Sequence, residues 1–145
     1  MLHQPTDEPP EKVFSIHRVV KKPWDPDRFM LLHTSDEGED LWMSKVPLMH
    51  SKFIEAMEVV RGPRGMTGLK CYLKRSGRQL WSQVKVNYAG QQTAVLIDGE
   101  LAFLWRITSY GEEFSRTFIV EGPWSREEAA AVAAQARLNF QKFKY

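Results

Sequence analysis

The sequence predicts an α+β fold in which an antiparallel β-meander is joined to two helices. Short segments rich in β-branched and aromatic residues recur between turn residues, as at 13–20 and 93–97, which is typical of strands. Asp98-Gly99 between two apolar segments predicts a tight hairpin, because both central residues of a type I′ turn need positive φ. The C-terminal segment instead carries apolar side chains at helical spacing. The predicted order is therefore three strands, a helix, five strands and a helix.

The length and composition favour one folded domain. A chain of 145 residues, 43% of them apolar, is of single-domain size and can bury its own core. Residues 13–145 are predicted to form this domain, and residues 1–12 a disordered tail that lacks the apolar region of a signal peptide. No run of about 18 apolar residues is present, so no membrane partner is expected. The lone Cys71 cannot form an internal disulfide, which favours the cytoplasm or another reducing intracellular compartment.

In the N-terminal half, three strands and a helix are expected. The strands lie at 13–20, 29–33 and 41–46, and the last two form a hairpin around an acidic segment. Pro47 suits the first turn of a helix, where a missing N–H costs nothing, and Gly62 would end that helix. Apolar residues recur within it at helical spacing, namely Met49, Phe53, Met57 and Val60.

In the C-terminal half, five strands and the second helix are expected. The strands lie at 69–74, 79–88, 93–97, 100–108 and 116–121. Ser125 and Glu128 form the capping box that begins the final helix, and Trp124 is expected to pack onto its first turns. Strands followed by a helix, twice over, resemble in topology the modules of the Whirly and PUR single-strand-binding folds.

Basic residues are concentrated in the middle of the sequence. Residues 59–97 contain no Asp or Glu. If 69–74 and 79–88 pair around a Ser76-Gly77 turn, Tyr72 faces Trp81, and lysines share that side of the sheet. Lysines contact phosphates, and exposed rings stack on bases at about 1–3 kcal/mol per base. The sequence thus predicts single-stranded RNA or DNA as the partner. The predicted nucleic-acid-binding residues are Arg61, Arg64, Lys70, Tyr72, Lys74, Arg75, Arg78, Trp81 and Lys85.

Other interpretations stay open. Lysines also protect edge strands, and an aromatic pair across two strands stabilises a sheet without any ligand. The alternative function is protein–protein interaction or homo-oligomerisation, because the hairpin at 93–108 is apolar on both sides. The predicted interface residues are Val95, Ile97, Ala102 and Leu104. A small-molecule pocket between sheet and helix is a third possibility, lined by residues such as Phe53, Met57, Phe103, Trp105 and Phe140, whose types and positions are more typical of core.

Catalytic and metal-binding motifs are not recognised in the sequence. His17, His33 and His50 form no pair at metal-ligand spacing, and the acidic segment 36–40 lacks the alternating ligands of a calcium loop. Cys71 falls on the buried side of its predicted strand. No Gly-rich phosphate loop and no nucleophile motif is present. We therefore expect a non-enzymatic protein without a cofactor or a bound metal.

Overall fold

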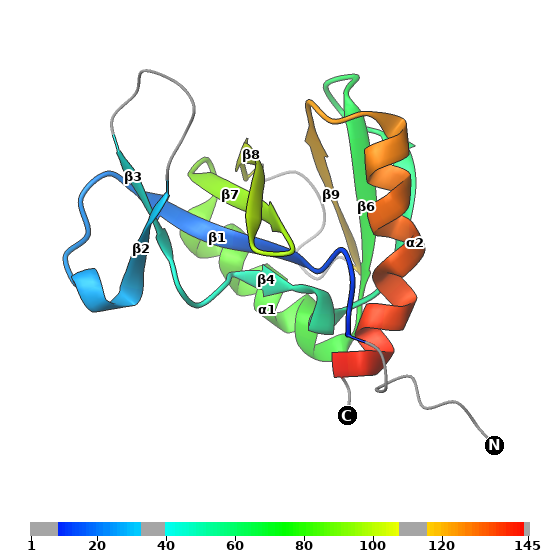
Figure 1. Cartoon of the computed structure of the whole chain (residues 1–145), viewed down its shortest axis with the longest axis horizontal. Coiled ribbons are helices and arrows are strands. Elements are labelled where there is room, and N and C mark those ends of the chain that lie inside the picture. Colours follow the sequence, from blue (N-terminus) through cyan, green and yellow to red (C-terminus); the bar gives the residue numbers. More distant parts are fainter. Residues whose placement is uncertain (1–8, 33–39, 108–115, 144–145) are drawn as a thin grey trace.

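The computed structural model describes residues 9–32, 40–107 and 116–143 (Figure 1). Its fold is α+β, with antiparallel sheets and two α-helices within these ranges, which confirms the predicted class. The first sheet has the order β2–β3–β1–β7–β8, and β4 pairs with β1 beside β3. Its strands are β1 (Phe14–Val20), β2 (Phe29–Leu32), β3 (Leu41–Ser44), β4 (Met49–His50), β7 (Gln92–Ile97) and β8 (Glu100–Arg106).

A second sheet and the two helices complete the described fold. The sheet has the order β5–β6–β9, and its strands are β5 (Ile54–Arg61), β6 (Thr67–Leu73) and β9 (Thr117–Gly122). Helix α1 (Arg75–Tyr88) follows β6 and contacts β4 and β6, while α2 (Arg126–Phe143) lies along β5 and β6 (Figure 1). Short 3-10 helices precede β2 and β5, namely η2 (Pro26–Arg28) and η3 (Ser51–Phe53).

The main core lies between the two sheets and the helices. Its buried side chains come from both sheets and both helices, and include Phe14 and Ile16 of β1, Leu69 of β6, Trp81 of α1 and Val132 of α2. A smaller apolar cluster lies beneath the β2–β3 hairpin and consists of Leu32, Met43, Ala94 and Leu96. Both faces of the β7–β8 hairpin are therefore largely covered by this chain itself.

Two local predictions are confirmed in atomic detail. Asp98 and Gly99 have φ values of 53° and 80°, as a type I′ turn requires. The Asp98 carboxylate also accepts hydrogen bonds from the backbone N–H groups of Lys12 (3.1 Å) and Val13 (2.8 Å), so the turn fixes the backbone before β1. In the capping box, the Glu128 carboxylate accepts from the Ser125 N–H and the Ser125 hydroxyl accepts from the Glu128 N–H, both at 3.0 Å.

The residues just before β1 also contact α2. The Glu11 carbonyl accepts a hydrogen bond from Asn139 Nδ2 at 2.6 Å, and the Pro9 carbonyl accepts one from Lys142 Nζ at 3.1 Å. These contacts bring the two ends of the described chain together (Figure 1). The division into a tail at 1–12 and a domain at 13–145 stays a prediction.

The helix predicted at 47–60 is wrong. That segment forms β4, η3 and β5, and β5 pairs with β6 along its whole length, with a register shift between Ile54 and Ala56. Ser51 helps to hold it, since its hydroxyl accepts from the Phe14 N–H at 2.8 Å. The apolar spacing there fits either period, and the β-branched Val59 and Val60 favour the strand that tertiary pairing selects.

The strand predicted at 79–88 is wrong too, because this segment is α1. Ser76-Gly77 belongs to the first turn of the helix and not to a hairpin. A Cβ at Gly77 would lie 2.9 Å from the Phe53 carbonyl oxygen, so glycine lets α1 lie directly against η3. Gly77, Trp81 and Val84 are buried at helical spacing, which was an available sequence signal for this helix.

The β7–β8 hairpin contains a bulge that changes its predicted faces. Leu96 pairs with Leu101, as a two-residue turn at Asp98-Gly99 requires, but Val95 pairs with Phe103, and the register shifts between Val95 and Leu96. Val95 therefore joins Phe103 in the main core and is separated from Leu104, with which it was grouped as a predicted interface residue.

Candidate functional site

The predicted stack of Tyr72 and Trp81 does not form. Trp81 is only 3% exposed, and its ring is stacked on Phe118, with ring centroids 4.2 Å apart. Tyr72 lies on β6 and is 36% exposed, but its hydroxyl donates to the Glu58 carboxylate at 3.2 Å. Trp81 is thus a core residue, and Tyr72 has a carboxylate as its neighbour.

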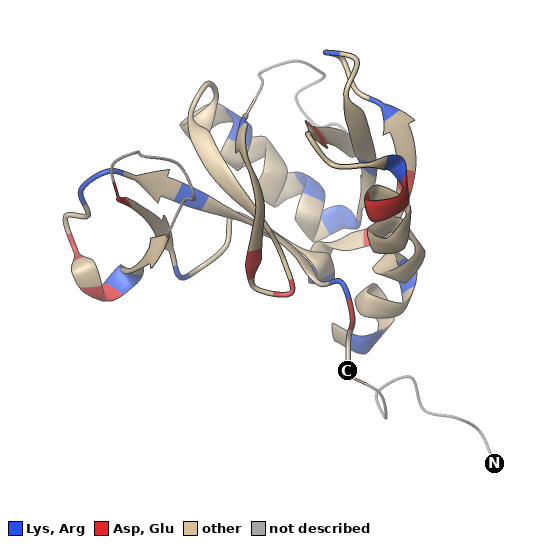
Figure 2. Ribbon diagram, turned by 45° about the horizontal axis from the view of Figure 1, so that its top comes forward, with Lys and Arg blue, Asp and Glu red and all other residues tan. Residues whose placement is uncertain are grey.

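The predicted basic residues lie on several different elements. Figure 2 shows Lys and Arg distributed over separate elements. Arg61 and Arg64 lie at the β5–β6 hairpin, where the Arg64 N–H donates to the buried Glu121 carboxylate at 2.9 Å. Lys70 lies on β6, and Lys74 directly precedes α1. The remaining predicted cations lie on α1, namely Arg75, Arg78 and Lys85.

Several of these cations have roles within the fold. The ammonium groups of Lys70 and Lys74 lie over the Tyr72 ring (5.5 Å) and the Phe53 ring (5.2 Å). Arg78 Nε donates to the Leu73 carbonyl at 3.2 Å, which ties α1 to the end of β6. Sequence segment 59–97 lacks acidic residues, but Glu58 and Glu121 place carboxylates beside Tyr72 and the Arg64 backbone.

The four predicted interface residues do not share one exposed face. Val95 is fully buried and Ala102 is exposed, while Ile97 packs against the main core and Leu104 against the smaller cluster. Phe103 and Trp105, considered above as pocket residues, are buried in the main core. Self-association through the β7–β8 hairpin stays a prediction.

A groove lined partly by aromatic side chains forms at a different place, beside the β2–β3 hairpin. It has a volume of about 460 Å³ and lies between the β1–β2 connection, the β3–β4 connection and the end of α1. We call it the aromatic groove. Its lining residues are Arg18, Trp24, Asp27, Arg28, Phe29, Ser44, Lys45, Val46, Pro47, Leu48 and Tyr88.

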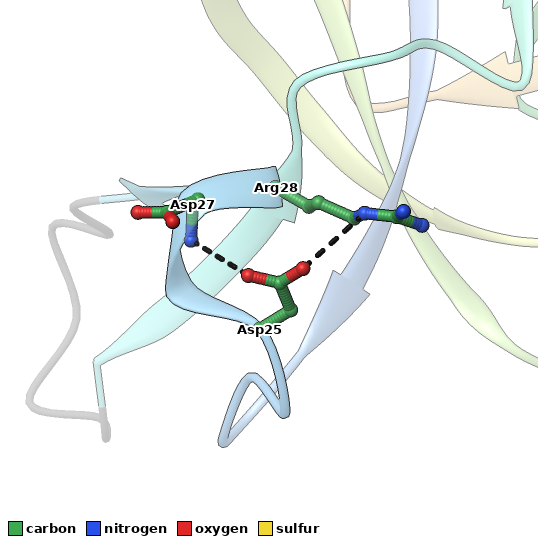
Figure 3. Close-up of polar contacts among 3 residues, drawn as sticks. All are labelled: Asp25, Asp27 and Arg28. Atoms are coloured by element: carbon green, nitrogen blue, oxygen red, sulfur yellow. Dashed lines mark hydrogen bonds and ion pairs between the residues drawn. The ribbon is translucent and has the colours of Figure 1, made fainter.

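One wall of the aromatic groove presents Trp24 to solvent. The Trp24 side chain is 63% exposed, and its ring meets the buried Phe29 ring edge-on at 5.0 Å. The backbone after Trp24 is fixed by Asp25, whose carboxylate accepts from the Asp27 N–H (3.2 Å) and pairs with Arg28 Nε (3.3 Å), as Figure 3 shows. This local capping of η2 holds Trp24 at the surface without burying it.

Another part of the lining is the apolar segment between β3 and β4. Val46 is 78% exposed and is followed by the half-buried Pro47 and Leu48. The Lys45 N–H donates to the Arg28 carbonyl (2.9 Å) and the Leu48 N–H to the Ile16 carbonyl (2.7 Å). The Val46 carbonyl accepts from the Ser44 hydroxyl at 2.9 Å. This part of the lining is therefore preformed by backbone hydrogen bonds.

Arg18 of β1 lies between the two aromatic sides of the groove. Its guanidinium carbon is 4.6 Å from the centre of the Trp24 ring and 5.3 Å from that of the Tyr88 ring. Arg18 Nε is buried and has no hydrogen-bond partner. Cation–π contacts thus hold a half-buried positive charge inside the groove.

His17 supports the same region from inside the fold. Its Nδ1 lies 2.6 Å from the Ser44 carbonyl, which can only accept, so Nδ1 carries the proton and Nε2 accepts from the Ser15 hydroxyl at 2.9 Å. Burial lowers the pKa of His17, opposed by the hydrogen bond to Ser44. A neutral His17 therefore fixes Ser44, a residue that lines the groove.

This site was not predicted from the sequence, although one feature of the sequence indicates an exposed aromatic residue. Trp24 lies between Pro23 and Asp25-Pro26, and a large aromatic residue within such a turn segment is held away from regular packing. Val46 and Tyr88 come from segments far apart in the sequence, so their convergence could not be predicted.

The described residues lack the features of a metal site or a reactive cysteine. Within the described ranges, no group of three or more His, Cys, Asp and Glu side chains could hold a metal ion. Cys71 is fully buried, which raises the pKa of its thiol far above the ordinary value. His33 and most of the acidic segment 36–40 lie outside the described residues. In the same ranges, we find no helix with the length and apolar character needed to span a bilayer.

Solved structures of SecDF share this fold. A structure of the membrane component SecDF that enhances protein export is 15% identical, with a TM-score of 0.61 over 89% of this chain and 63% of that chain. SecDF in a super-membrane-facing form is 17% identical, with a TM-score of 0.61 over 88% of this chain and 19% of its own. SecDF, a translocon-associated membrane protein from Thermus thermophilus, is 15% identical, with a TM-score of 0.51 over 90% of this chain and 20% of its own.

The chain therefore spans less than two thirds of the SecDF chains it resembles. No protein-family model and no curated protein matches the sequence. The resemblance to Whirly and PUR folds is not confirmed. The prediction of single-stranded RNA or DNA as the partner is wrong: the solved structures named above are of SecDF, described as a component that enhances protein export, and Trp81, one of the two rings of the predicted stack, is buried.

Proposed function

We propose that this chain is a non-enzymatic protein-binding domain that holds an extended segment of another polypeptide in the aromatic groove. The observation that carries the proposal is that two large apolar side chains lining this groove are exposed on a fixed backbone. Trp24 and Val46 remain largely exposed although hydrogen bonds fix the backbone on either side of them. Exposed aromatic and aliphatic side chains on a rigid frame are typical of protein interaction sites, because little conformational entropy is lost on binding.

The setting that we propose for this binding is protein export. The fold shared with SecDF, described as a component that enhances protein export, supports this setting. An unfolded polypeptide exposes apolar side chains that a folded protein buries. A groove of about 460 Å³ has room for a few such side chains and not for a folded partner.

The compartment is a separate proposal. The single cysteine favours a reducing compartment such as the cytoplasm. However, the buried Cys71 thiol has a raised pKa and is not accessible to oxidants, so it would persist in an oxidising compartment as well. The cysteine content therefore places no restriction on an export role.

Fluorescence anisotropy with an unfolded polypeptide tests the proposed function. The probe is fluorescein-labelled, reduced and alkylated α-lactalbumin, which stays unfolded in solution. Val46→Ser removes an apolar side chain that the ligand would cover, and we expect Kd to rise roughly tenfold, as the loss of about 1.5 kcal/mol implies.

The chain offers a matched control for this experiment. Val86 of α1 is 75% exposed, close to the 78% of Val46, but does not line the groove. Val86→Ser should leave Kd unchanged. Equal effects of the two substitutions, or no binding by the unmodified protein, would refute the proposed function.

A further inference from the structure

We propose that Arg18 gives the aromatic groove a preference for polypeptide segments in which an Asp or Glu side chain lies next to an apolar residue. This inference rests on the proposed function and specifies its ligand. The carboxylate of the ligand would pair with the Arg18 guanidinium, and the neighbouring apolar side chain would pack between Trp24 and Val46.

The position of Arg18 differs from that of an ordinary surface arginine. The side chain is half-buried and its guanidinium lies over the Trp24 and Tyr88 rings, at 4.6 and 5.3 Å. These rings attract the cation through their faces but accept no in-plane hydrogen bond. The N–H groups of Arg18 project in the guanidinium plane and remain available for an acceptor.

The hydrogen-bonding of Arg18 is incomplete in the fold. Its Nε is buried and unpartnered, which is costly for a donor that belongs to a charged group. Among the described residues, no carboxylate lies within ion-pair distance of this guanidinium, whereas Arg28 at the rim pairs with Asp25 at 3.3 Å. Because Nε is too buried for a ligand to reach, the carboxylate of a ligand would pair with the two terminal nitrogens of the Arg18 guanidinium.

The charges around the groove favour an anionic group. Arg28 is already paired with Asp25, so in the described part of the chain Arg18 and Lys45 are the cations that line the groove without such a pair, against one carboxylate, Asp27. A carboxylate matches the fork of a guanidinium and forms two parallel hydrogen bonds with it. Because the proposed ligand is an internal segment of a chain, the carboxylate is that of an Asp or Glu side chain and not of a C-terminus.

The decisive test compares two short labelled peptides on the unmodified protein. Both are N-acetylated and C-amidated and carry leucine and phenylalanine, and they differ only in having glutamate or glutamine beside the phenylalanine. We expect the glutamate peptide to bind roughly tenfold more tightly in anisotropy titrations, which corresponds to about 1.4 kcal/mol. The preference should decrease with rising salt, as expected for a charged pair.

Substitutions then assign the preference to Arg18. Arg18→Met keeps the apolar stem and should abolish the preference, so that the Kd values of the glutamate and glutamine peptides become equal. Arg137→Met, at an exposed position on α2 outside the groove, should keep the full preference. Circular dichroism verifies that both variants fold, and the two-peptide comparison on the unmodified protein needs no variant.

The outcomes separate this inference from the proposed function. Equal binding of the two peptides to the unmodified protein would overturn the role of Arg18 and leave polypeptide binding intact. A glutamate preference that survives Arg18→Met would also overturn it. If neither peptide nor unfolded α-lactalbumin binds, the proposed function fails, and this inference fails with it.

Discussion

Trp81→Ala tests whether this tryptophan belongs to the core or to a binding surface. Its side chain is 3% exposed and stacked on Phe118 at 4.2 Å, with the Trp105 ring nearly parallel at 6.2 Å. Truncating a buried aromatic residue costs about 3–5 kcal/mol, from lost apolar burial and the cavity that remains. The total free energy of unfolding of a domain is about 5–15 kcal/mol, so this one change removes a large part of it.

Urea unfolding followed by far-UV circular dichroism measures this loss. With an m-value of about 2 kcal/mol/M, a loss of 4 kcal/mol lowers the midpoint by about 2 M. Trp24→Ala is the matched control, because Trp24 is 63% exposed and contacts only the Phe29 ring edge and the Arg18 guanidinium among the interactions described above; we expect a loss of about 1 kcal/mol. If Trp81→Ala costs no more than Trp24→Ala, the packing of α1 described above is wrong.

Two further predictions concern stability. A Cβ at Gly122 would lie 2.5 Å from the Phe103 ring, so Gly122→Ala should cost about 1–3 kcal/mol in the same urea assay, and an unchanged midpoint would contradict the close approach of β9 to β8. Burial lowers the pKa of His17 and His50 from 6.5, so below that pH the unfolded chain binds more protons than the folded one. The free energy of unfolding should have its full value above pH 6.5 and decrease below that pH, by at most about 1.4 kcal/mol per pH unit for each histidine. His17→Asn should reduce this slope, and a stability that does not change with pH would refute the prediction.

The parts of the fold that were predicted correctly depend on short-range interactions. The type I′ turn at Asp98-Gly99 needs only its own two residues, and the Ser125–Glu128 capping box closes within one helical turn. Such features are determined by neighbours in the sequence. The α+β class and the final helix followed from them.

The parts that failed depend on contacts distant in sequence. In segment 79–88, apolar and polar residues largely alternate as in a strand. Gly77, Trp81 and Val84 also have the spacing of one helix face, and only packing against η3 and the core decides between the two structures. A bulge between Val95 and Leu96 reversed the faces predicted for the last hairpin.

The prediction of a nucleic-acid-binding site was wrong for a related reason. The predicted nucleic-acid-binding face assumed that 79–88 is a strand, but this segment is helical. Residues 59–97 contain no Asp or Glu, but Glu58 and Glu121 on adjoining strands lie close to them in the fold. The aromatic groove combines Arg18, Trp24, Val46 and Tyr88, whose approach depends on the whole fold. Residue types alone therefore indicated neither its place nor its composition.

Chemical-shift mapping tests the central claim most directly. Unlabelled, unfolded α-lactalbumin is titrated into the ¹⁵N-labelled full chain, and the amide and indole signals are followed. The account predicts that the indole N–H of Trp24, alone among the five tryptophans, shifts strongly together with the amides of Arg18, Val46 and Tyr88. Shifts centred on the β5–β6 hairpin, or distributed evenly over the surface, would contradict it.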